Sequence, residues 1–467
     1  MPDTMKGKTY AITTFGCQMN ERDSETAAGL LSEIGMCESR DRDEADVVII
    51  NTCSVRENAD HRLFGVLGQL KKIKEARPDF IVGVCGCMMQ QQHIVDTLQQ
   101  KYPWVDLIFG THNIQELPKL LLSAASEKKK QVEILTEAAE TAEGLPAKRL
   151  YPFKAFVNIM YGCDNFCTYC IVPYTRGRER SRAPESIMDE VRGLAAGGAK
   201  EVTLLGQNVN SYKGAGGAGF TELVYMLSEI DGIERIRFMT SHPKDLSDKL
   251  IGAFAECRKL CGHIHLPVQS GSSRVLERMN RKYTKEGYLD LIGRLRGSLE
   301  GIAVTTDIIV GFPGEEEEDF EETLDVVRKA EFDSAFTFLY SVRKGTPAAG
   351  YENQVPEEVK HGRFNRLVDL LNGISAKKNK AYEGRTEKVL VEGRSKTNPG
   401  AYAGRTDSFK LVNFKSGQDM TGEIVDVLIT GSKTFSLYGE GLCKSIYRGR
   451  CPQPRWGSAP YPGGTRK

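Results

Sequence analysis

The sequence has 467 residues, 40% hydrophobic and 27% charged, a composition typical of a folded protein with about three domains. The 63 Lys and Arg residues almost balance the 62 Asp and Glu residues, so net charge gives no indication of nucleic-acid binding. Neither a long apolar run nor an N-terminal signal pattern occurs, so we expect no membrane span and a cytoplasmic protein.

The sequence contains 12 cysteines, and most of them lie in groups. Structural disulfides are rare in the reducing cytosol. Metal binding is therefore the leading interpretation of the cysteine groups.

Residues 8–125 are predicted to form an N-terminal parallel α/β sheet domain, because β-rich runs alternate with helical patterns. The polar residues 126–148 are predicted to be a linker. The expected strands are residues 10–15, 47–51 and 81–85, and the expected helices are residues 22–34 and 59–74.

Three cysteines of this domain, Cys17, Cys53 and Cys87, each directly follow a predicted strand. Ligands of an open parallel sheet gather outside the carboxyl ends of its strands. We therefore expect these cysteines to meet at one edge and to hold an iron–sulfur cluster. The alternative is that they are small buried residues, which is what we expect for Cys37 and Cys85.

Residues 149–382 are predicted to form an open partial (β/α)6 barrel, because six strand patterns are each followed by a helix. The expected strands are residues 153–159, 201–205, 233–239, 263–268, 303–310 and 335–340. The expected helices are residues 185–196, 222–230, 245–255, 285–299, 320–330 and 357–379.

Cys163, Cys167 and Cys170 follow the first of these strands within eight residues. Three thiolates at this spacing can hold three of the four irons of a cubane cluster. A structural zinc ion would require a fourth ligand nearby, but the next Cys or His along the chain is His242. The spacing therefore favours a cluster with one open iron.

A second zinc alternative is a site formed by Cys257, Cys261, His263 and His265. Side chains alternate along a strand, so His263 and His265 should share one strand face directed into the barrel. A zinc site would require a helix end and a strand to converge, which makes this alternative weaker.

Polar residues at the ends of later strands are predicted to bind a cofactor, because strand-end residues of such barrels form the active site. For any one of them, the alternative is a simple strand-terminating turn. The candidates are Gly206, Gln207, Asn208, Ser241, Gln269, Thr306 and Asp307.

Four arginines, Arg176, Arg178, Arg180 and Arg182, follow the second cysteine group. They could be a solvated charge run. However, arginine binds phosphate bidentately, and this run lies beside the predicted cluster. The run therefore favours an RNA-binding surface.

Residues 383–448 are predicted to form a small all-β module, because short alternating strands such as residues 388–392 and 423–428 are separated by Gly, Asn and Ser. Such a module could instead serve dimerisation or packing. The Pro- and Gly-rich residues 449–467 are predicted to be a disordered tail.

The segment from Cys163 to Cys170, with Tyr169 before the last cysteine, resembles the hallmark of radical S-adenosylmethionine (SAM) enzymes. The resemblance implies that SAM chelates the open iron and is cleaved to methionine and a 5′-deoxyadenosyl radical. It also makes Tyr169 a candidate cofactor-binding residue.

Residues 16–20, 51–53 and 86–88 resemble the methylthiotransferase family, in which Cys17, Cys53 and Cys87 would hold an auxiliary cluster that carries the sulfur. Gln18-Met19-Asn20 and the arginine run are similar to the branch acting on isopentenyladenosine beside the tRNA anticodon, the MiaB type. Residues 404–410 and 422–425 resemble a TRAM domain, which implies RNA binding by Arg405 and Lys410.

The family resemblance implies two [4Fe-4S] clusters, two SAM molecules per turnover, and a tRNA substrate methylthiolated at adenine C2. No side-chain base can usefully remove the hydrogen on C2, so a carbon radical is the plausible route. We predict no catalytic residue beyond the six cluster cysteines. We also expect a monomer, an external electron donor of the flavodoxin or ferredoxin type, and a sulfur donor that the sequence does not identify.

Two alternatives remain open. A methylthiotransferase acting on threonylcarbamoyl-adenosine tRNA or on a ribosomal protein would share nearly every motif. A non-catalytic iron–sulfur protein for RNA binding or redox sensing would not require SAM.

Overall fold

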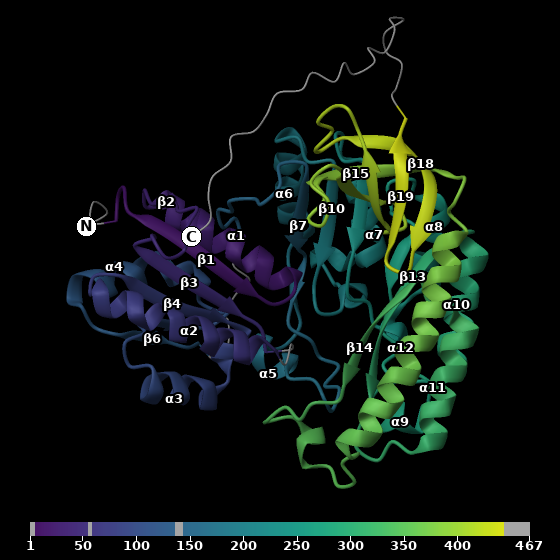
Figure 1. Ribbon diagram of the computed structural model, residues 1–467, viewed down its shortest axis with the longest axis horizontal. Coiled ribbons are helices and arrows are strands. Elements are labelled where there is room, and N and C mark those ends of the chain that lie inside the picture. Colours follow the sequence, from purple (N-terminus) through teal and green to yellow (C-terminus); the bar gives the residue numbers. More distant parts are fainter. Residues whose placement is uncertain (1–4, 55–57, 136–142, 443–467) are drawn as a thin grey trace, which may run out of the picture.

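The computed structural model describes residues 5–54, 58–135 and 143–442, which form two α/β units and a β-barrel (Figure 1). The predicted tail, residues 449–467, lies outside the described residues. Within the described residues, no helix is long and apolar enough to span a membrane.

The N-terminal unit is a six-stranded parallel sheet in the order β2-β1-β3-β4-β5-β6. Its strands are β1 (Thr9–Phe15), β2 (Cys37–Glu38), β3 (Val47–Thr52), β4 (Ile81–Gly86), β5 (Leu107–Phe109) and β6 (Gln131–Glu133). Its helices are α1 (Gln18–Glu33), α2 (Asn58–Ala76), α3 (Gln92–Lys101) and α4 (Leu117–Glu127), with 3₁₀ turns η2 (Cys87–Gln90) and η3 (Ile114–Glu116).

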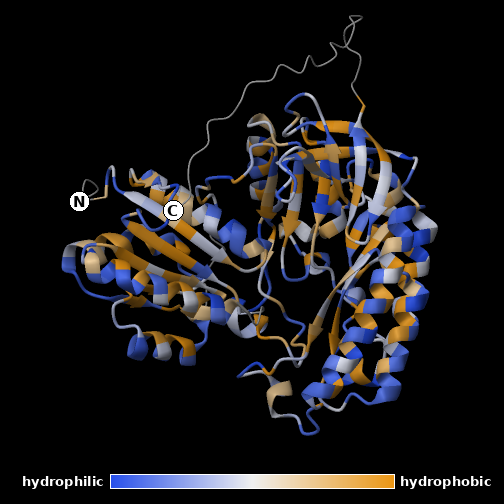
Figure 2. Cartoon of the chain, viewed as in Figure 1, coloured by the Kyte–Doolittle hydropathy of each residue, from blue (hydrophilic) through white to orange (hydrophobic). Residues whose placement is uncertain are grey.

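Alternating residues of β3 show how both faces of this sheet are buried. Val47 and Ile49 belong to one apolar cluster, and Val48 and Ile50 belong to the other. A parallel sheet covered by helices on both faces requires such hydrophobic strands. Figure 2 shows these strands as hydrophobic and the surrounding helices as mixed.

The segment predicted to be a linker contributes to this sheet. β6 pairs with β5 through Leu107 and Gln131, Ile108 and Val132, and Phe109 and Glu133. Its residues are not strongly apolar because β6 is an edge strand, and the sequence pattern therefore did not identify it.

The central unit confirms the six predicted strands, which form two three-stranded parallel sheets joined by a bridge between Ile236 and Leu260. The strands are β7 (Lys154–Asn158), β10 (Glu201–Leu205), β11 (Arg235–Phe238), β12 (His263–His265), β13 (Ala303–Val310) and β14 (Ser334–Leu339). The open side of this partial barrel, between β7 and β14, is directed toward the N-terminal sheet (Figure 1).

Helices cover the outside of the partial barrel and bury its apolar core. They are α6 (Pro184–Ala196), α7 (Phe220–Ser228), α8 (Asp248–Glu256), α9 (Ser273–Arg278), α10 (Lys285–Ser298), α11 (Glu317–Ala330) and α12 (Glu357–Lys380). Shorter elements are β8 (Met160–Tyr161), α5 (Val172–Arg176), β9 (Arg180–Ser181), η4 (Val209–Ser211), η5 (Ala215–Gly217), η6 (Pro243–Asp245) and η7 (Pro347–Gly350).

β12 is shorter than the predicted strand because Pro267 has no N–H to donate to the ladder. Around Pro267, the hydroxyl of Thr306 replaces the backbone groups as the hydrogen-bond partner of this segment. It donates to the carbonyl of Leu266 and accepts from the N–H of Val268, both across 2.9 Å. The chain therefore leaves the regular strand but stays attached to β13.

The C-terminal module is a closed five-stranded barrel in the order β15-β16-β17-β19-β18, as predicted for a TRAM-like domain. Its strands are β15 (Thr386–Arg394), β16 (Tyr402–Thr406), β17 (Leu411–Lys415), β18 (Ile424–Lys433) and β19 (Ser436–Gly441). The loop between β16 and β17 packs against the N-terminal end of the central barrel, where Phe409 stacks on His263 with ring centroids 5.0 Å apart.

Candidate active site

The structure brings Cys17, Cys53 and Cys87 together at the carboxyl ends of β1, β3 and β4. Cys17 precedes α1, Cys53 follows β3, and Cys87 begins η2. A hydrogen bond with Cys53 is the main cause that lowers the pKa of Cys17 to about 5, and Arg176 also favours the thiolate. Burial raises the pKa of Cys87, an effect that Arg176 opposes.

Arg176 is buried at this edge of the sheet. Its Nε donates to Cys87 Sγ across 3.0 Å, and its Nη2 pairs with Asp23 Oδ2 across 2.7 Å. The guanidinium group is therefore directed at the cysteine site instead of the surface.

The two remaining cysteines of this domain differ in burial. Cys85 lies inside β4, in the apolar cluster with Ile81 and Leu107, and burial raises its pKa strongly. Cys37 is exposed on the two-residue edge strand β2, so the prediction of a buried residue was wrong for Cys37.

The loop with Cys163, Cys167 and Cys170 connects β8 to α5. The N–H of Cys163 donates to the carbonyl of Gly177 across 3.1 Å, and that of Cys170 donates to Cys167 across 2.9 Å. Burial raises the pKa of Cys163 to about 11 and that of Cys170 to about 12. A cation beside either sulfur would lower these pKa values and favour the thiolate.

Arg281 contacts this loop, although no sequence motif indicated this contact. Its Nη1 lies 3.4 Å from Cys167 Sγ, its Nη2 donates to the carbonyl of Pro267 across 3.0 Å, and its Nε donates to Tyr283. Tyr169 is half-buried close to this guanidinium, and desolvation raises its pKa. No local motif marks a residue that reaches the cluster loop from more than 100 positions away.

Within the described chain, no three His, Cys, Asp or Glu side chains are close enough to hold a single metal ion. The thiolates of a cubane cluster each bind a different iron and need not converge on one point. The finding does weigh against zinc at Cys257, Cys261, His263 and His265. Both histidines instead contact the Thr305 hydroxyl across 3.0 Å.

Three of the predicted SAM residues follow β10 and contact protein groups. A Cβ on Gly206 would meet the Met160 side chain at 2.5 Å. Gln207 Oε1 accepts from the N–H of Gly162 across 2.9 Å, and its amide nitrogen contacts Met19 in the N-terminal domain. Asn208 is buried, accepts from the N–H of His242 and donates to Asp245.

Of the other predicted SAM residues, Ser241 and Gln269 follow β11 and β12, but Thr306 and Asp307 lie inside β13, so the prediction of strand-end positions was wrong for these two. The hydroxyl of Ser241 is buried and has no hydrogen-bond partner among the described residues, as expected for a group that meets a bound polar ligand. Gln269 has a φ of +67°, rare for a residue with a side chain, and Asp307 lies 3.4 Å from His265. Thr306 instead holds the backbone after β12.

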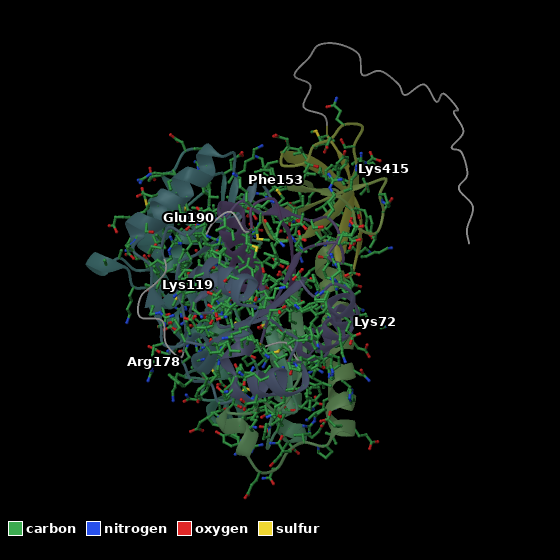
Figure 3. The ribbon with its side chains drawn as sticks, turned by 90° about the vertical axis from the view of Figure 1, so that its left-hand side faces the viewer. Lys72, Lys119, Phe153, Arg178, Glu190 and Lys415 are labelled. Atoms are coloured by element: carbon green, nitrogen blue, oxygen red, sulfur yellow. The ribbon has the colours of Figure 1, made fainter. Side chains whose placement is uncertain are left out.

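The arginines of the predicted RNA-binding run do not share one surface. Arg178 is exposed and lies at the edge of the molecule in Figure 3. Arg180 is half-buried, and Arg182 is buried and pairs with Glu190 across 2.6 Å. The guanidinium groups of Arg176 and Arg182 are therefore occupied inside the protein.

The two predicted RNA contacts of the C-terminal module pair with other protein groups. Lys410 is buried and pairs with Asp333 of the central unit across 2.9 Å. Arg405 is half-buried; its guanidinium carbon lies 4.2 Å from the ring centroid of Phe409, and it donates to the Phe409 carbonyl. Lys410 therefore connects the module to the central barrel, whereas Arg405 contacts its own module.

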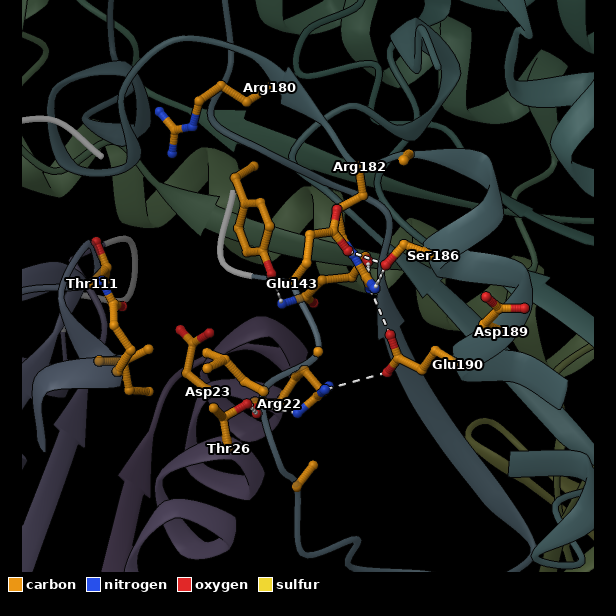
Figure 4. Close-up of a pocket in the computed structure, with 18 of the residues that line it drawn as sticks. Arg22, Asp23, Thr26, Thr111, Glu143, Arg180, Arg182, Ser186, Asp189 and Glu190 are labelled. Carbon is orange, nitrogen blue, oxygen red and sulfur yellow. Dashed lines mark hydrogen bonds and ion pairs between the residues drawn. The ribbon is translucent and has the colours of Figure 1, made fainter. Parts of the chain in front are cut away.

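A cavity of about 860 Å³ lies between α1 and α6 (Figure 4), and Asp23 and Arg176 are among the residues that line it. Glu190 accepts from Arg22, Arg149 and Arg182 in its wall. Of the described residues that line it, none is a cysteine. The cavity therefore borders the cysteine site without containing it.

Comparisons with known proteins match all three units. Residues 157–327 match the Radical SAM superfamily, residues 9–110 match Uncharacterized protein family UPF0004, and residues 380–442 match the TRAM domain.

Curated relatives match almost the whole chain. A tRNA-2-methylthio-N(6)-dimethylallyladenosine synthase from Clostridium tetani is 55% identical over 92% of this chain and 96% of the relative. A protein of the same name from Clostridioides difficile is 54% identical over 93% of this chain and 92% of the relative.

Among solved structures, the radical SAM methyltransferase TsrM from Kitasatospora setae, with cobalamin and a [4Fe-4S] cluster bound, shares the fold. The TM-score is 0.53 at 14% identity, over 73% of this chain and 77% of that chain.

Proposed function

The chain belongs to the tRNA-2-methylthio-N(6)-dimethylallyladenosine synthase family, and from this we propose that it inserts a methylthio group at C2 of N6-dimethylallyladenosine in tRNA. We further propose that it does so with two [4Fe-4S] clusters, using SAM, and that it is a cytoplasmic monomer. The electron donor is an external protein of the flavodoxin or ferredoxin type.

One observation carries this proposal: adjacent residues connect the two cysteine groups. The carbonyl of Gly177 accepts from the N–H of Cys163, while the side chain of the preceding residue, Arg176, donates to Cys87. A sulfur source and a radical source must act on the same adenine, so their sites must adjoin. The short connection supports this arrangement.

The chain's own cysteines would hold the two cofactors. Cys163, Cys167 and Cys170 would bind the SAM cluster, and Cys17, Cys53 and Cys87 would bind the auxiliary cluster. When bound, the clusters and SAM supply the electron, the carbon radical and the sulfur. Arg281 and Arg176 each place a guanidinium hydrogen bond on one thiolate, Cys167 and Cys87, respectively.

Ser241 and Gln269, which follow their strands, and Asp307, which lies inside β13, would meet the polar groups of SAM. The unpartnered Ser241 hydroxyl supports this assignment. The remaining predicted residues would support this SAM site and would not contact SAM through their polar groups, because those groups contact the surrounding protein. They are Tyr169, Gly206, Gln207, Asn208 and Thr306.

We assign the RNA contacts to side chains that remain accessible. Arg178 and Arg180 would meet tRNA phosphates beside the cluster loop. On the C-terminal module, the exposed residues Lys433, Phe435 and Tyr438 offer the basic and aromatic groups that bind RNA, whereas Lys410 is buried and the half-buried Arg405 stacks on Phe409.

The test is an anaerobic reaction of the reconstituted protein with SAM, a reductant and tRNA carrying N6-dimethylallyladenosine. Mass spectrometry of the nucleosides should show the 2-methylthio product together with 5′-deoxyadenosine. Product from threonylcarbamoyl-adenosine tRNA alone would assign the chain to the other tRNA branch. SAM cleavage without any tRNA product would contradict the proposal.

A further inference from the structure

Two large apolar side chains are exposed on the last strand of the central barrel. Phe336 and Phe338 on β14 are 58% and 46% exposed. Residues two apart share a strand face, and the intervening Thr337 points to the other face, against which α12 packs. Both rings therefore lie on the inner face of the barrel.

Polar groups of β12 and β13 lie beside these rings. Phe336 is paired in register with Asp307, and Phe338 is paired with Ile309. The ring centroid of His265 lies 6.1 Å from that of Phe336, and His265 Nε2 lies 3.4 Å from Asp307. An apolar surface with a few polar groups at its edge is typical of a ligand site.

The wall formed by Phe336 and Phe338 lies between contacts at the two ends of the barrel. At the N-terminal end of the barrel, Phe409 stacks on His263. At the other end, the chain after β14 joins the cysteine loop, where the N–H of Ala348 donates to the carbonyl of Thr168 across 2.9 Å. Figure 1 shows β14 at the open side of the barrel, the side directed toward the N-terminal sheet.

We propose that the wall of Phe336 and Phe338 receives the N6-dimethylallyl group of the substrate adenine and thereby selects the prenylated tRNA. This inference rests on the proposed function. The dimethylallyl group is an uncharged hydrocarbon that gains from contact with aromatic rings. A threonylcarbamoyl group carries a carboxylate, which the apolar wall and the neighbouring Asp307 would disfavour.

The experiment measures binding of the reconstituted full-length protein to two labelled anticodon stem-loop RNAs by fluorescence anisotropy. One RNA carries N6-dimethylallyladenosine and the other carries adenosine at the same position. In Phe336→Ala and Phe338→Ala, the preference for the prenylated RNA should fall about tenfold, as expected for lost apolar contacts. Affinity for the unmodified RNA should stay unchanged.

Phe435→Ala is the matched control, because Phe435 is 74% exposed and lies on the C-terminal module. It should leave the ratio of the two affinities unchanged. Phe336→Leu and Phe338→Leu keep an apolar side chain and should retain most of the preference. Unchanged affinity for the unmodified RNA shows that an alanine variant is folded, and loss of the preference in the alanine but not the leucine variants shows that apolar contact selects the prenylated RNA.

An unchanged preference in all four wall variants would overturn the inference. The inference would also be overturned if the wall variants bound both RNAs equally more weakly and bound SAM more weakly as well. That result would assign the wall to SAM. Methylthio product formed by the unaltered protein is measured in parallel. If the unaltered protein makes no product while the wall variants lose the preference, the proposed function fails and the wall assignment stands.

Discussion

Arg176 donates its Nε hydrogen to the Sγ of Cys87 across 3.0 Å, although 89 positions separate the two residues. The same guanidinium pairs with Asp23. A buried cation thus lies against the sulfur of Cys87, and a carboxylate holds this cation in place. Hydrogen bonds to sulfur are among the factors that set the potential of a cluster.

Arg176→Ala should lower the reduction potential of the auxiliary cluster, because the thiolate loses its hydrogen-bond donor. Activity should fall about 10–100-fold, as for other groups that orient metal ligands. Redox titration followed by electron paramagnetic resonance measures the potential. Arg178→Ala, in the same run but exposed, should leave the potential unchanged; an equal shift in both variants would contradict the assignment.

Cys85 and Cys87 provide a direct test of the strand register, since only two positions separate them. Cys87→Ala should lose the auxiliary cluster and retain roughly half of the bound iron. Cys85→Ala should retain all of it and cost about 1 kcal/mol in unfolding free energy, as a core substitution. Iron analysis and urea unfolding measure both effects, and the reverse pattern would move the ligand assignment to Cys85.

Glu190 connects the N-terminal domain to the central barrel through Arg22, Arg149 and Arg182. Burial opposes its ionisation, but the charges of Arg182 and Arg22 outweigh burial and hold the pKa of Glu190 below its usual value. Glu190→Gln should therefore cost about 3 kcal/mol near neutral pH, because it leaves buried arginines without a carboxylate.

The pH dependence of this effect follows from the lowered pKa. The stabilisation by Glu190 is fully present above its unfolded pKa of about 4.3 and is lost as pH falls through the lower folded pKa. Urea unfolding at pH 7 and at lower pH should show the two proteins converging in acid. Asp79→Asn, in an exposed pair with Lys128, is the control and should leave the unfolding midpoint unchanged.

Phe409 of the C-terminal module packs against the central barrel. Its ring stacks on His263 and lies 4.7 Å from the guanidinium carbon of Arg237. Phe409→Ala should lower the unfolding free energy by about 2 kcal/mol and speed proteolysis between the units. Phe435→Ala, on the exposed turn of the same module, should do neither. Equal proteolysis rates in both variants would show that the contact contributes little.

The sequence by itself determined the positions of β1, β3, β4 and the six strands of the central barrel, and of the two groups of three cysteines relative to them. Apolar periodicity placed the strands, and a cysteine directly after a strand lies at the sheet edge whatever the rest of the chain does. Cys17, Cys53 and Cys87 could therefore be expected to meet, because the carboxyl ends of parallel strands share one edge. Cys85, two positions earlier, falls inside the strand for the same reason.

Only the tertiary structure decided the partners of the long charged side chains. Arg176 and Arg178 are two positions apart in one arginine run, yet one lies against Cys87 and the other is exposed. Lys410 pairs with Asp333 of another unit, and Arg281 reaches Cys167. The sequence around a Lys or Arg residue does not indicate the partner of its long side chain. That partner belongs to an element that comes from a distant part of the chain and packs beside it in the fold.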